Sequence, residues 1–286
     1  MKPAPHRLII FCDSIKIAHS VFALPFAIAA VFLAAEGWPP VAVLGKVILA
    51  VVLARTSAMA FNRFADARID AENPRTASRA IPRGLLSRSF MLGASLFSAA
   101  LFVAVAASIN RLALALSPVV LCVLLGYSYT KRFTSLSHIV LGAALGLSPV
   151  GAWVAVRGEL DVLPALLGAA VLFWTAGFDM IYACQDREFD SSHGLHSIPS
   201  RLGVARALLL SRLFHIIAVA LLVAVGSLAE QGVVYGLGVL TIVVLLVYEH
   251  SIVTPRDLSR VNVAFFTLNG LVSLAFMTAV VVQAVI

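Results

Sequence analysis

Residues 41–70 read VAVLGKVILAVVLARTSAMAFNRFADARID, a long apolar run that ends in a short acidic one. The apolar part, residues 41–62, is long enough to cross the hydrocarbon core of a bilayer as an α-helix, which takes about 20 residues. Its end places Asn62, Asp66 and Asp70 at four-residue intervals. Because an α-helix has about 3.6 residues per turn, these side chains are predicted to form one polar row where the helix leaves the membrane.

The rest of the chain is equally apolar. Of its 286 residues, 61% are hydrophobic and only 12% are charged, whereas a soluble domain is about 45–50% apolar and about 25% charged. Nine apolar segments have the length of a membrane span and leave no room for a soluble domain. The sequence therefore predicts an all-α, polytopic membrane protein with a bundle of nine transmembrane helices. The predicted spans are residues 15–35, 41–62, 88–108, 112–129, 137–156, 162–183, 207–228, 232–252 and 262–285.

The basic residues indicate the orientation. If the spans alternate from a cytoplasmic N-terminus, the opposite side of the membrane holds only Lys46, Arg111 and Arg157, and nearly all other Lys and Arg residues are cytoplasmic. Cytoplasmic loops carry an excess of Lys and Arg. The N-terminus and the long polar loops 63–87 and 184–206 are therefore predicted to be cytoplasmic, with the loops forming a cap. The net charge of +7 reflects this topology and an anionic lipid surface, not nucleic acid.

The two long loops resemble each other. Each begins with two aspartates four residues apart, Asp66/Asp70 and Asp186/Asp190, and each later has an Ile-Pro and a Gly. Four spans separate the loops, so both acidic helices leave the membrane in the same direction. This is the pattern of a duplicated four-helix unit with a ninth helix appended. The predicted units are residues 15–129 and 137–252, within a single intramembrane domain of residues 1–286.

The second acidic cluster lies in FDMIYACQDREFD, where Asp179, Tyr182, Asp186 and Asp190 share one helix face. Single aspartates at a membrane boundary commonly meet only water or nearby arginines. Aspartates at a helix C-terminal end, however, oppose the helix macrodipole, which favours cations there. Carboxylates suit Mg²⁺, which takes oxygen ligands and keeps waters or substrate phosphates in its shell. Two acidic faces across a cavity are thus expected to hold two Mg²⁺ ions with a diphosphate between them.

These motifs resemble the signatures of the UbiA superfamily of intramembrane prenyltransferases. The pattern N-x-x-x-D-x-x-x-D at residues 62–70 resembles the first signature, and the acidic pattern at residues 179–190 resembles the second. RTASRAIPRG, residues 75–84, and YSYTKR, residues 127–132, resemble two further family segments, although Ser128 replaces the usual proline. The resemblance covers essentially the whole chain, including the predicted spans and their orientation.

The resemblance implies Mg²⁺-dependent transfer of a polyprenyl group from a polyprenyl diphosphate to an aromatic acceptor. An electron-rich ring carbon attacks the allylic cation, and a base removes the displaced ring proton. Asp179 and Asp190 are alternative bases. The implied roles are metal binding by Asn62, Asp66, Asp70, Asp186 and Asp190, and diphosphate binding by Arg79, Lys131 and Arg132.

Three further residues are candidates for the acceptor side of the site. Arg55 lies inside a span, where a charge is costly and is usually functional or paired. It is expected either to bind an acceptor carboxylate or to neutralise Asp66 and its neighbours. His19 either lines the acceptor pocket or bonds a backbone carbonyl, and Tyr182 is expected to shield the cation with its ring.

The acceptor itself stays open. HSVFALPFA, residues 19–27, and both loops look like a bacterial branch of 4-hydroxybenzoate polyprenyltransferases, which includes proposed menaquinone-pathway enzymes acting on 1,4-dihydroxy-6-naphthoate. Better-known ubiquinone enzymes often have Asp where this chain has Arg63, so either acid fits, and prenyl chain length and oligomeric state stay open too. The expected location is the bacterial cytoplasmic (inner) membrane, with the active site facing the cytoplasm. The alternatives are a superfamily relative that acts on heme, chlorophyll or a lipid, and a transporter, whose polar site would lie near the bilayer midplane.

Overall fold

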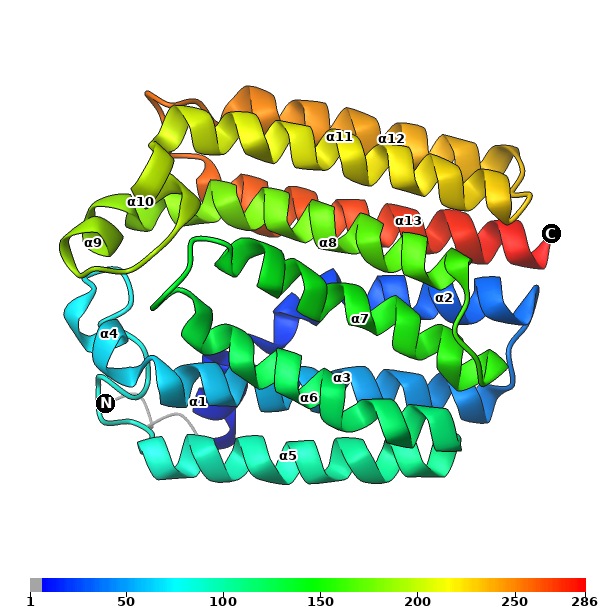
Figure 1. The fold of residues 1–286 in the computed structure, drawn as a ribbon, viewed down its shortest axis with the longest axis horizontal. Coiled ribbons are helices and arrows are strands. Elements are labelled where there is room, and N and C mark those ends of the chain that lie inside the picture. The colour runs from blue at the N-terminus through cyan, green and yellow to red at the C-terminus, as the bar shows by residue number, and fades with distance from the viewer. Residues whose placement is uncertain (1–6) are drawn as a thin grey trace, which may run out of the picture.

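The computed structural model of the chain describes residues 7–286, apart from the side chains of residues 18 and 19. Within the described residues the fold is helical, without a strand, and the long helices run side by side along one axis (Figure 1). Eight helices are long and apolar enough to cross a membrane. They are α3 (Val41–Ala65), α5 (Arg88–Ile109), α6 (Arg111–Thr130), α7 (Ser137–Arg157), α8 (Val162–Ala183), α11 (Val204–Leu228), α12 (Val233–Ile252), and the π-helix η3 (Val263–Leu268) continued by α13 (Asn269–Val285).

The first predicted span, residues 15–35, is built differently. After α1 (Arg7–Ser14) the chain forms a 3₁₀ helix, η1 (Ile17–Phe22), and then the short α2 (Leu24–Ala35). Most of α2 is buried against α7, α13 and α3, so it belongs to the interior. The described chain thus has eight membrane-length helices where nine were predicted. The start of the predicted cytoplasmic tail, residues 1–6, lies outside the described residues.

Small residues let the central helices approach closely. A Cβ atom at Gly142 of α7 would lie 2.3 Å from the Leu172 carbonyl oxygen of α8, and one at Gly146 would lie 2.4 Å from that of Gly168. Without a side chain at these positions the two backbones pack directly, as is common between helices in membranes. The contact holds α8, and therefore the second acidic motif, against α7.

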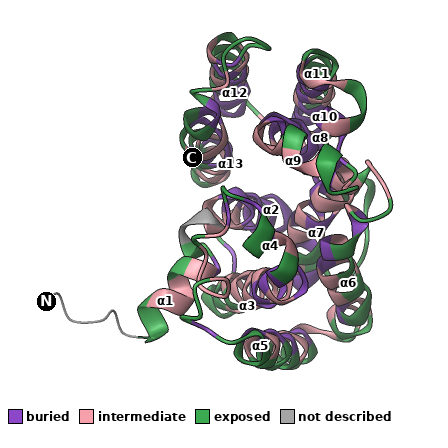
Figure 2. Ribbon diagram, turned by 90° about the vertical axis from the view of Figure 1, so that its left-hand side faces the viewer, coloured by how far each residue is buried: buried purple, intermediate pink, exposed green. Residues whose placement is uncertain are grey.

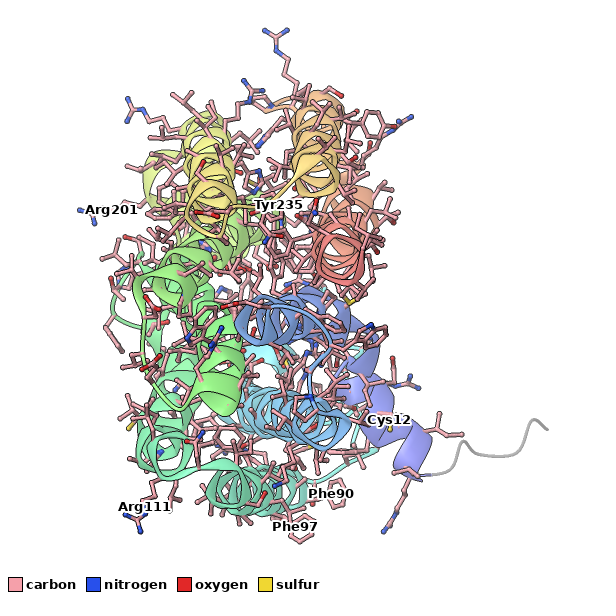
Figure 3. The ribbon with its side chains drawn as sticks, turned by 90° about the vertical axis from the view of Figure 1, so that its right-hand side faces the viewer. Cys12, Phe90, Phe97, Arg111, Arg201 and Tyr235 are labelled. Carbon is pink, nitrogen blue, oxygen red and sulfur yellow. The ribbon has the colours of Figure 1, made fainter. Side chains whose placement is uncertain are left out.

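Aromatic side chains pack together in the interior of the bundle. Phe26 of α2 lies 5.0 Å, between ring centroids, from both Trp174 of α8 and Phe276 of α13. In contrast, Phe90 and Phe97 of α5 project outward and are 46% and 67% exposed (Figure 3). Large apolar side chains are exposed on α3, α5, α6, α8, α11, α12 and α13, which suits a lipid environment rather than water.

Both acidic motifs interrupt their helices at the same point. Asp66, between α3 and α4 (Ala67–Glu72), has φ −90° and ψ 4°. Asp186, the last residue of η2 (Cys184–Asp186) and the N-cap of α9 (Arg187–Ser192), has φ −98° and ψ 3°. Together with α10 (Ile198–Leu202), the short helices α4 and α9 cover one end of the bundle (Figures 1 and 2). The prediction that both motifs leave the bundle in the same direction is confirmed. The four-helix repeat stays a prediction, and the matched interruptions agree with it.

Candidate active site

A cavity of about 690 Å³ lies beneath these cap segments, with walls from α3, α5, α6, α7 and α8. Away from the cap its lining is mostly apolar and includes Val47, Phe102 and Val154. Beneath the cap it is polar, and residues of both acidic motifs line it. These are Asn62, Asp66 and Asp70 from the first motif, and Asp179, Tyr182, Asp186 and Asp190 from the second.

Basic side chains hold the carboxylates of the first motif. The Lys131 ammonium donates to Oδ2 of Asp66 at 2.6 Å, and the Asn62 amide donates to the same oxygen at 3.1 Å. Arg79 donates to Oδ1 of Asp70 at 2.6 Å. Both aspartates are buried, and a buried carboxylate requires such a partner because desolvation disfavours its charge. Two of the three cations predicted to bind a diphosphate, Lys131 and Arg79, therefore lie directly beside the predicted metal ligands.

The second motif is bound by the loop that follows the first. Nε of Arg75 donates to Oδ1 of Asp186 at 2.8 Å, and Asn73 donates to the same oxygen at 3.0 Å. Arg75 also donates to the Tyr182 hydroxyl at 2.8 Å. Burial acts to lower the pKa of Arg75, but its hydrogen bond to Asp186 and the charge of that carboxylate outweigh burial and raise it. The two motifs are thus joined across one cavity.

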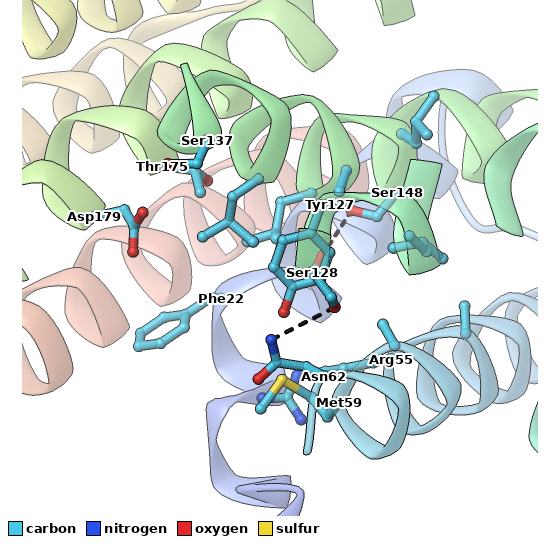
Figure 4. A pocket seen from close by; sticks show the side chains of 18 of the residues that line it. Phe22, Arg55, Met59, Asn62, Tyr127, Ser128, Ser137, Ser148, Thr175 and Asp179 are labelled. Atoms are coloured by element: carbon cyan, nitrogen blue, oxygen red, sulfur yellow. Dashed lines mark hydrogen bonds between the residues drawn. The ribbon is translucent and has the colours of Figure 1, made fainter. Parts of the chain in front are cut away.

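Arg63 fixes the orientation of the Asn62 amide. Its Nη1 donates to Oδ1 of Asn62 at 3.1 Å, while its Nε donates to the Ser14 carbonyl at 2.9 Å. Since the oxygen of the Asn62 amide is engaged by Arg63, its nitrogen is directed at Asp66 and, at 3.5 Å, at Ser128 (Figure 4). Arg63, the position at which better-known ubiquinone enzymes often have Asp, therefore anchors the first motif.

Deeper in the cavity, Arg55 is a cation without a carboxylate partner among the described residues. Within the part of the chain that the structure describes, its one hydrogen bond goes to the Ile15 carbonyl at 3.3 Å, and it lines the cavity together with Tyr127 and Thr175 (Figure 4). The Thr175 hydroxyl is buried and has no hydrogen-bond partner in the described structure. An orphaned hydroxyl and an unneutralised guanidinium in one cavity are suited to a polar ligand, because each costs free energy when it is left unmatched.

The remaining candidates have different surroundings. Arg132 donates to the Ala65 carbonyl at 2.7 Å and lies over the ring of Tyr129, at 4.8 Å from its centroid. Tyr182 stacks on Phe265, with ring centroids 4.2 Å apart. Asp179 meets His138, and their nearest atoms are 2.6 Å apart. The side chain of His19 lies outside the described residues.

Sequence reasoning did not identify Thr175 or His138. Thr175 lies four residues before Asp179, so the helical period places it on the face of the acidic motif. This four-residue spacing could have identified Thr175 as a candidate site residue. His138 shares no motif with Asp179, which is 41 residues away, and only the packing of α7 on α8 relates the two.

The donor set fits a hard divalent cation, since all its members offer carboxylate or amide oxygens. In the described residues, however, no three acidic, histidine or cysteine side chains converge closely enough to hold an ion. The carboxylates are spread over two helix ends and are paired with Lys131, Arg79 and Arg75. Metal binding by these residues therefore requires that they exchange partners with these cations.

Comparison with known proteins agrees with this geometry. Residues 23–271 match the UbiA prenyltransferase family. The chain is 32% identical over 246 residues to the 4-hydroxybenzoate octaprenyltransferase of Shewanella sp. (strain W3-18-1), with 84% of each chain covered. It is 32% identical over 250 residues to the protein of the same name from Photobacterium profundum, with 87% of this chain and 86% of that one covered.

Two solved structures share the fold. The apo structure of a UbiA homologue from Aeropyrum pernix K1 superposes with a TM-score of 0.85 at 36% identity, covering 93% of this chain and 98% of that one. A UbiA homologue from Archaeoglobus fulgidus, solved bound to GPP and Mg²⁺, superposes with a TM-score of 0.70 at 20% identity, covering 96% and 99%.

The family match spans most of the chain, and the relatives agree with it along nearly their whole lengths. Eight membrane-length helices and a polar cavity capped at one end are consistent with the same assignment. The chain therefore belongs to the UbiA prenyltransferase family and is an integral membrane prenyltransferase.

Proposed function

We propose that the protein transfers a polyprenyl group from a polyprenyl diphosphate to a hydroxylated aromatic acid. The observation that carries the proposal is the order of groups along one cavity: acidic and basic side chains beneath the cap, the lone cation Arg55 deeper, and apolar walls beyond. The polar end suits a diphosphate, Arg55 suits the carboxylate of an aromatic acid, and the apolar walls suit an isoprenoid tail. The relatives named 4-hydroxybenzoate octaprenyltransferases support it.

The diphosphate is assigned to the polar end. Lys131 and Arg79 are already directed at this region by Asp66 and Asp70, and arginine is able to grip phosphate oxygens in pairs. Arg132, next to Lys131, is assigned a supporting contact. Mg²⁺, when bound, neutralises negative charge that grows on the leaving diphosphate. The residues that would hold it are Asn62, Asp66, Asp70, Asp186 and Asp190.

The aromatic acid is assigned to the pocket of Arg55 and Thr175. Its carboxylate pairs with the guanidinium, and the orphaned Thr175 hydroxyl supplies a hydrogen bond. The apolar surroundings exclude water, which would otherwise capture the allylic cation, and the ring of Tyr182 shields that cation. Asp179 is the proposed base, because Asp190, the alternative, is assigned to the metal.

The environment of the reaction is part of the proposal. The isoprenoid tail enters from the lipid and occupies the apolar part of the cavity, around Val47, Phe102 and Val154. The capped end, which carries the arginine-rich loops, faces the cytoplasm of a bacterial inner membrane. The product belongs to ubiquinone biosynthesis if the acceptor is 4-hydroxybenzoate, and to menaquinone biosynthesis if it is 1,4-dihydroxy-6-naphthoate.

A transporter is disfavoured because α4 and α9, which follow Asp66 and Asp186, lie at one end of the bundle (Figure 1). The test is incubation of the membrane-embedded protein with a radiolabelled polyprenyl diphosphate, Mg²⁺ and a panel of acceptors. We expect prenylated 4-hydroxybenzoate or 1,4-dihydroxy-6-naphthoate. Arg55→Gln should raise the KM of the acid while leaving that of the diphosphate unchanged, and should not affect a neutral methyl ester of the same acid. Transfer only to heme, chlorophyll precursors or a lipid alcohol would contradict the proposal.

A further inference from the structure

We infer that His138 is the positioning residue of the base: it holds Asp179 as a hydrogen-bond acceptor with one carboxylate oxygen directed to the acceptor ring. The inference rests on the proposed function and deepens it. Its basis is a pair of hydrogen bonds that fix the tautomer of His138 and link the base to the cap.

His138 lies in the first turn of α7 and is only 3% exposed. Its Nδ1 is 2.6 Å from Oδ2 of Asp179, on the neighbouring α8. Its other ring nitrogen, Nε2, accepts a 3.3 Å hydrogen bond from the backbone N–H of Ile198. Both nitrogens of the imidazole are therefore engaged inside the protein.

These two partners determine where the imidazole proton lies. A backbone N–H only donates, so Nε2 must carry the lone pair. Nδ1 then carries the proton and donates it to Asp179, because a neutral imidazole has one donor and one acceptor nitrogen. A donor fixed in this way holds the carboxylate of Asp179 in one orientation. Asp179 lines the cavity (Figure 4), and Oδ1 is the oxygen that this bond leaves for the substrate.

The second bond connects the base to the cap. Ile198 is the first residue of α10, and its N-cap residue Ser197 is fixed by a capping box with Ser200. Two residues earlier, the backbone N–H of His196 donates to the Lys131 carbonyl at 2.7 Å. Residues 196–198 therefore contact both the proposed diphosphate ligand and the residue that orients the base. This segment therefore links the two halves of the site.

His138 supports the loss of the ring proton at the end of an electrophilic aromatic substitution. A bond forms between C1 of the allylic chain and a ring carbon of the acceptor, and the bond between C1 and the diphosphate oxygen breaks. The ring C–H bond then breaks, its electron pair restores the aromatic ring, and its proton goes to Oδ1 of Asp179. His138 keeps its own proton throughout, so it takes no part in the proton transfer and acts by holding Asp179.

Two substitutions separate this role from simple anchoring of the cap. The amide nitrogen of Asn lies near the position of Nδ1, so His138→Asn keeps a donor to Asp179 and leaves the Ile198 N–H without an acceptor. The carboxamide of Gln reaches the position of Nε2, so His138→Gln keeps the acceptor for Ile198 and removes the donor to Asp179. Each variant serves as the matched control of the other.

The experiment measures kcat, both KM values and the isotope effect of deuterium at the reacting ring position, using the full-length protein in nanodiscs. We expect His138→Gln to lower kcat by roughly tenfold or more, a part of what a general base contributes. The KM of the polyprenyl diphosphate should stay near the wild-type value. Its isotope effect should exceed that of the wild type, since removal of the ring proton becomes slow. His138→Asn should keep most of kcat and the wild-type isotope effect.

The reverse order, with His138→Asn impaired and His138→Gln normal, would show a cap anchor only and would overturn the inference. An unchanged isotope effect in His138→Gln would overturn it as well. Because the isotope effect is a ratio, it remains decisive even if part of the variant protein is unfolded. If the wild type prenylates no aromatic acid, the proposed function fails; if the wild type is active and these variants do not differ as stated, only the role of His138 fails.

Discussion

Arg75 donates a 2.8 Å hydrogen bond from Nε to Oδ1 of Asp186, and a second guanidinium nitrogen contacts the other carboxylate oxygen. The two residues lie 111 positions apart in the sequence. One belongs to the loop after the first acidic motif and the other to the second motif, so this pair closes the cap over the cavity. In a catalytic cycle that binds a metal at Asp186, Arg75 has to give up at least part of this contact.

The first prediction concerns this closure. Arg75→Gln should lower the free energy of unfolding by about 1 kcal/mol, the upper end for a partly exposed ion pair, because water weakens the attraction between the two charges. Thermal unfolding in detergent measures the change. Arg83→Gln, at an exposed position of the same loop, is the control and should leave the midpoint unchanged. Equal loss in both variants would show that the pair contributes nothing specific.

The second prediction concerns Thr175, whose hydroxyl is buried without a partner in the described structure. Thr175→Val removes an unsatisfied polar group and keeps the shape of the side chain. The ligand-free protein should therefore be as stable as the wild type or more stable by about 1 kcal/mol. The same variant should bind the aromatic acid more weakly, as a higher KM. Lower stability together with an unchanged KM would show that Thr175 serves the fold instead of the acceptor.

The third prediction concerns Lys131, which is 2.6 Å from Asp66. Lys131→Met removes a charged donor worth about 1.5–3 kcal/mol, and should therefore raise the KM of the polyprenyl diphosphate about 10- to 150-fold. Lys131→Arg keeps the charge and should retain most of the affinity. Steady-state kinetics at saturating aromatic acid tests both variants. A normal KM in Lys131→Met would remove Lys131 from the diphosphate site.

Much of the fold follows from hydrophobic length. The segment expected at residues 112–129 is α6 (Arg111–Thr130), and that expected at 137–156 is α7 (Ser137–Arg157). The segment predicted at residues 15–35 forms a shorter apolar helix, and the difference has a local cause. Pro25 has no backbone N–H and so starts a helix more readily than it continues one, and α2 begins at Leu24. Apolar composition alone did not distinguish a short buried helix from a lipid-facing span.

The sequence predicted which residues form the site, but it did not predict which side chains contact one another there. Regular spacing identified Asp66, Asp70, Asp186 and Asp190, because a helical period converts directly into a shared face, and the structure brings these side chains to one cavity. The four-residue spacing of the aspartates did not reveal the helix breaks at Asp66 and Asp186. Each break involves a single residue, and the chain is helical on both sides of it, so the spacing of the side chains stays that of a helix. The contact of His138 with Asp179 depends on how α7 packs on α8, which no local pattern encodes.

The most direct test of the central claim is a stoichiometric assay of the wild type, Asp66→Asn and Asp186→Asn in the presence of Mg²⁺. It follows pyrophosphate release and prenylated aromatic acid together in the same reconstituted membranes. We expect one pyrophosphate per prenylated product in the wild type, loss of both in each variant with the fold retained, and loss of both in the wild type when Mg²⁺ is chelated. Transfer at the wild-type rate in either variant, or transfer that persists without a divalent cation, would contradict the claim that the two acidic motifs act together on one diphosphate.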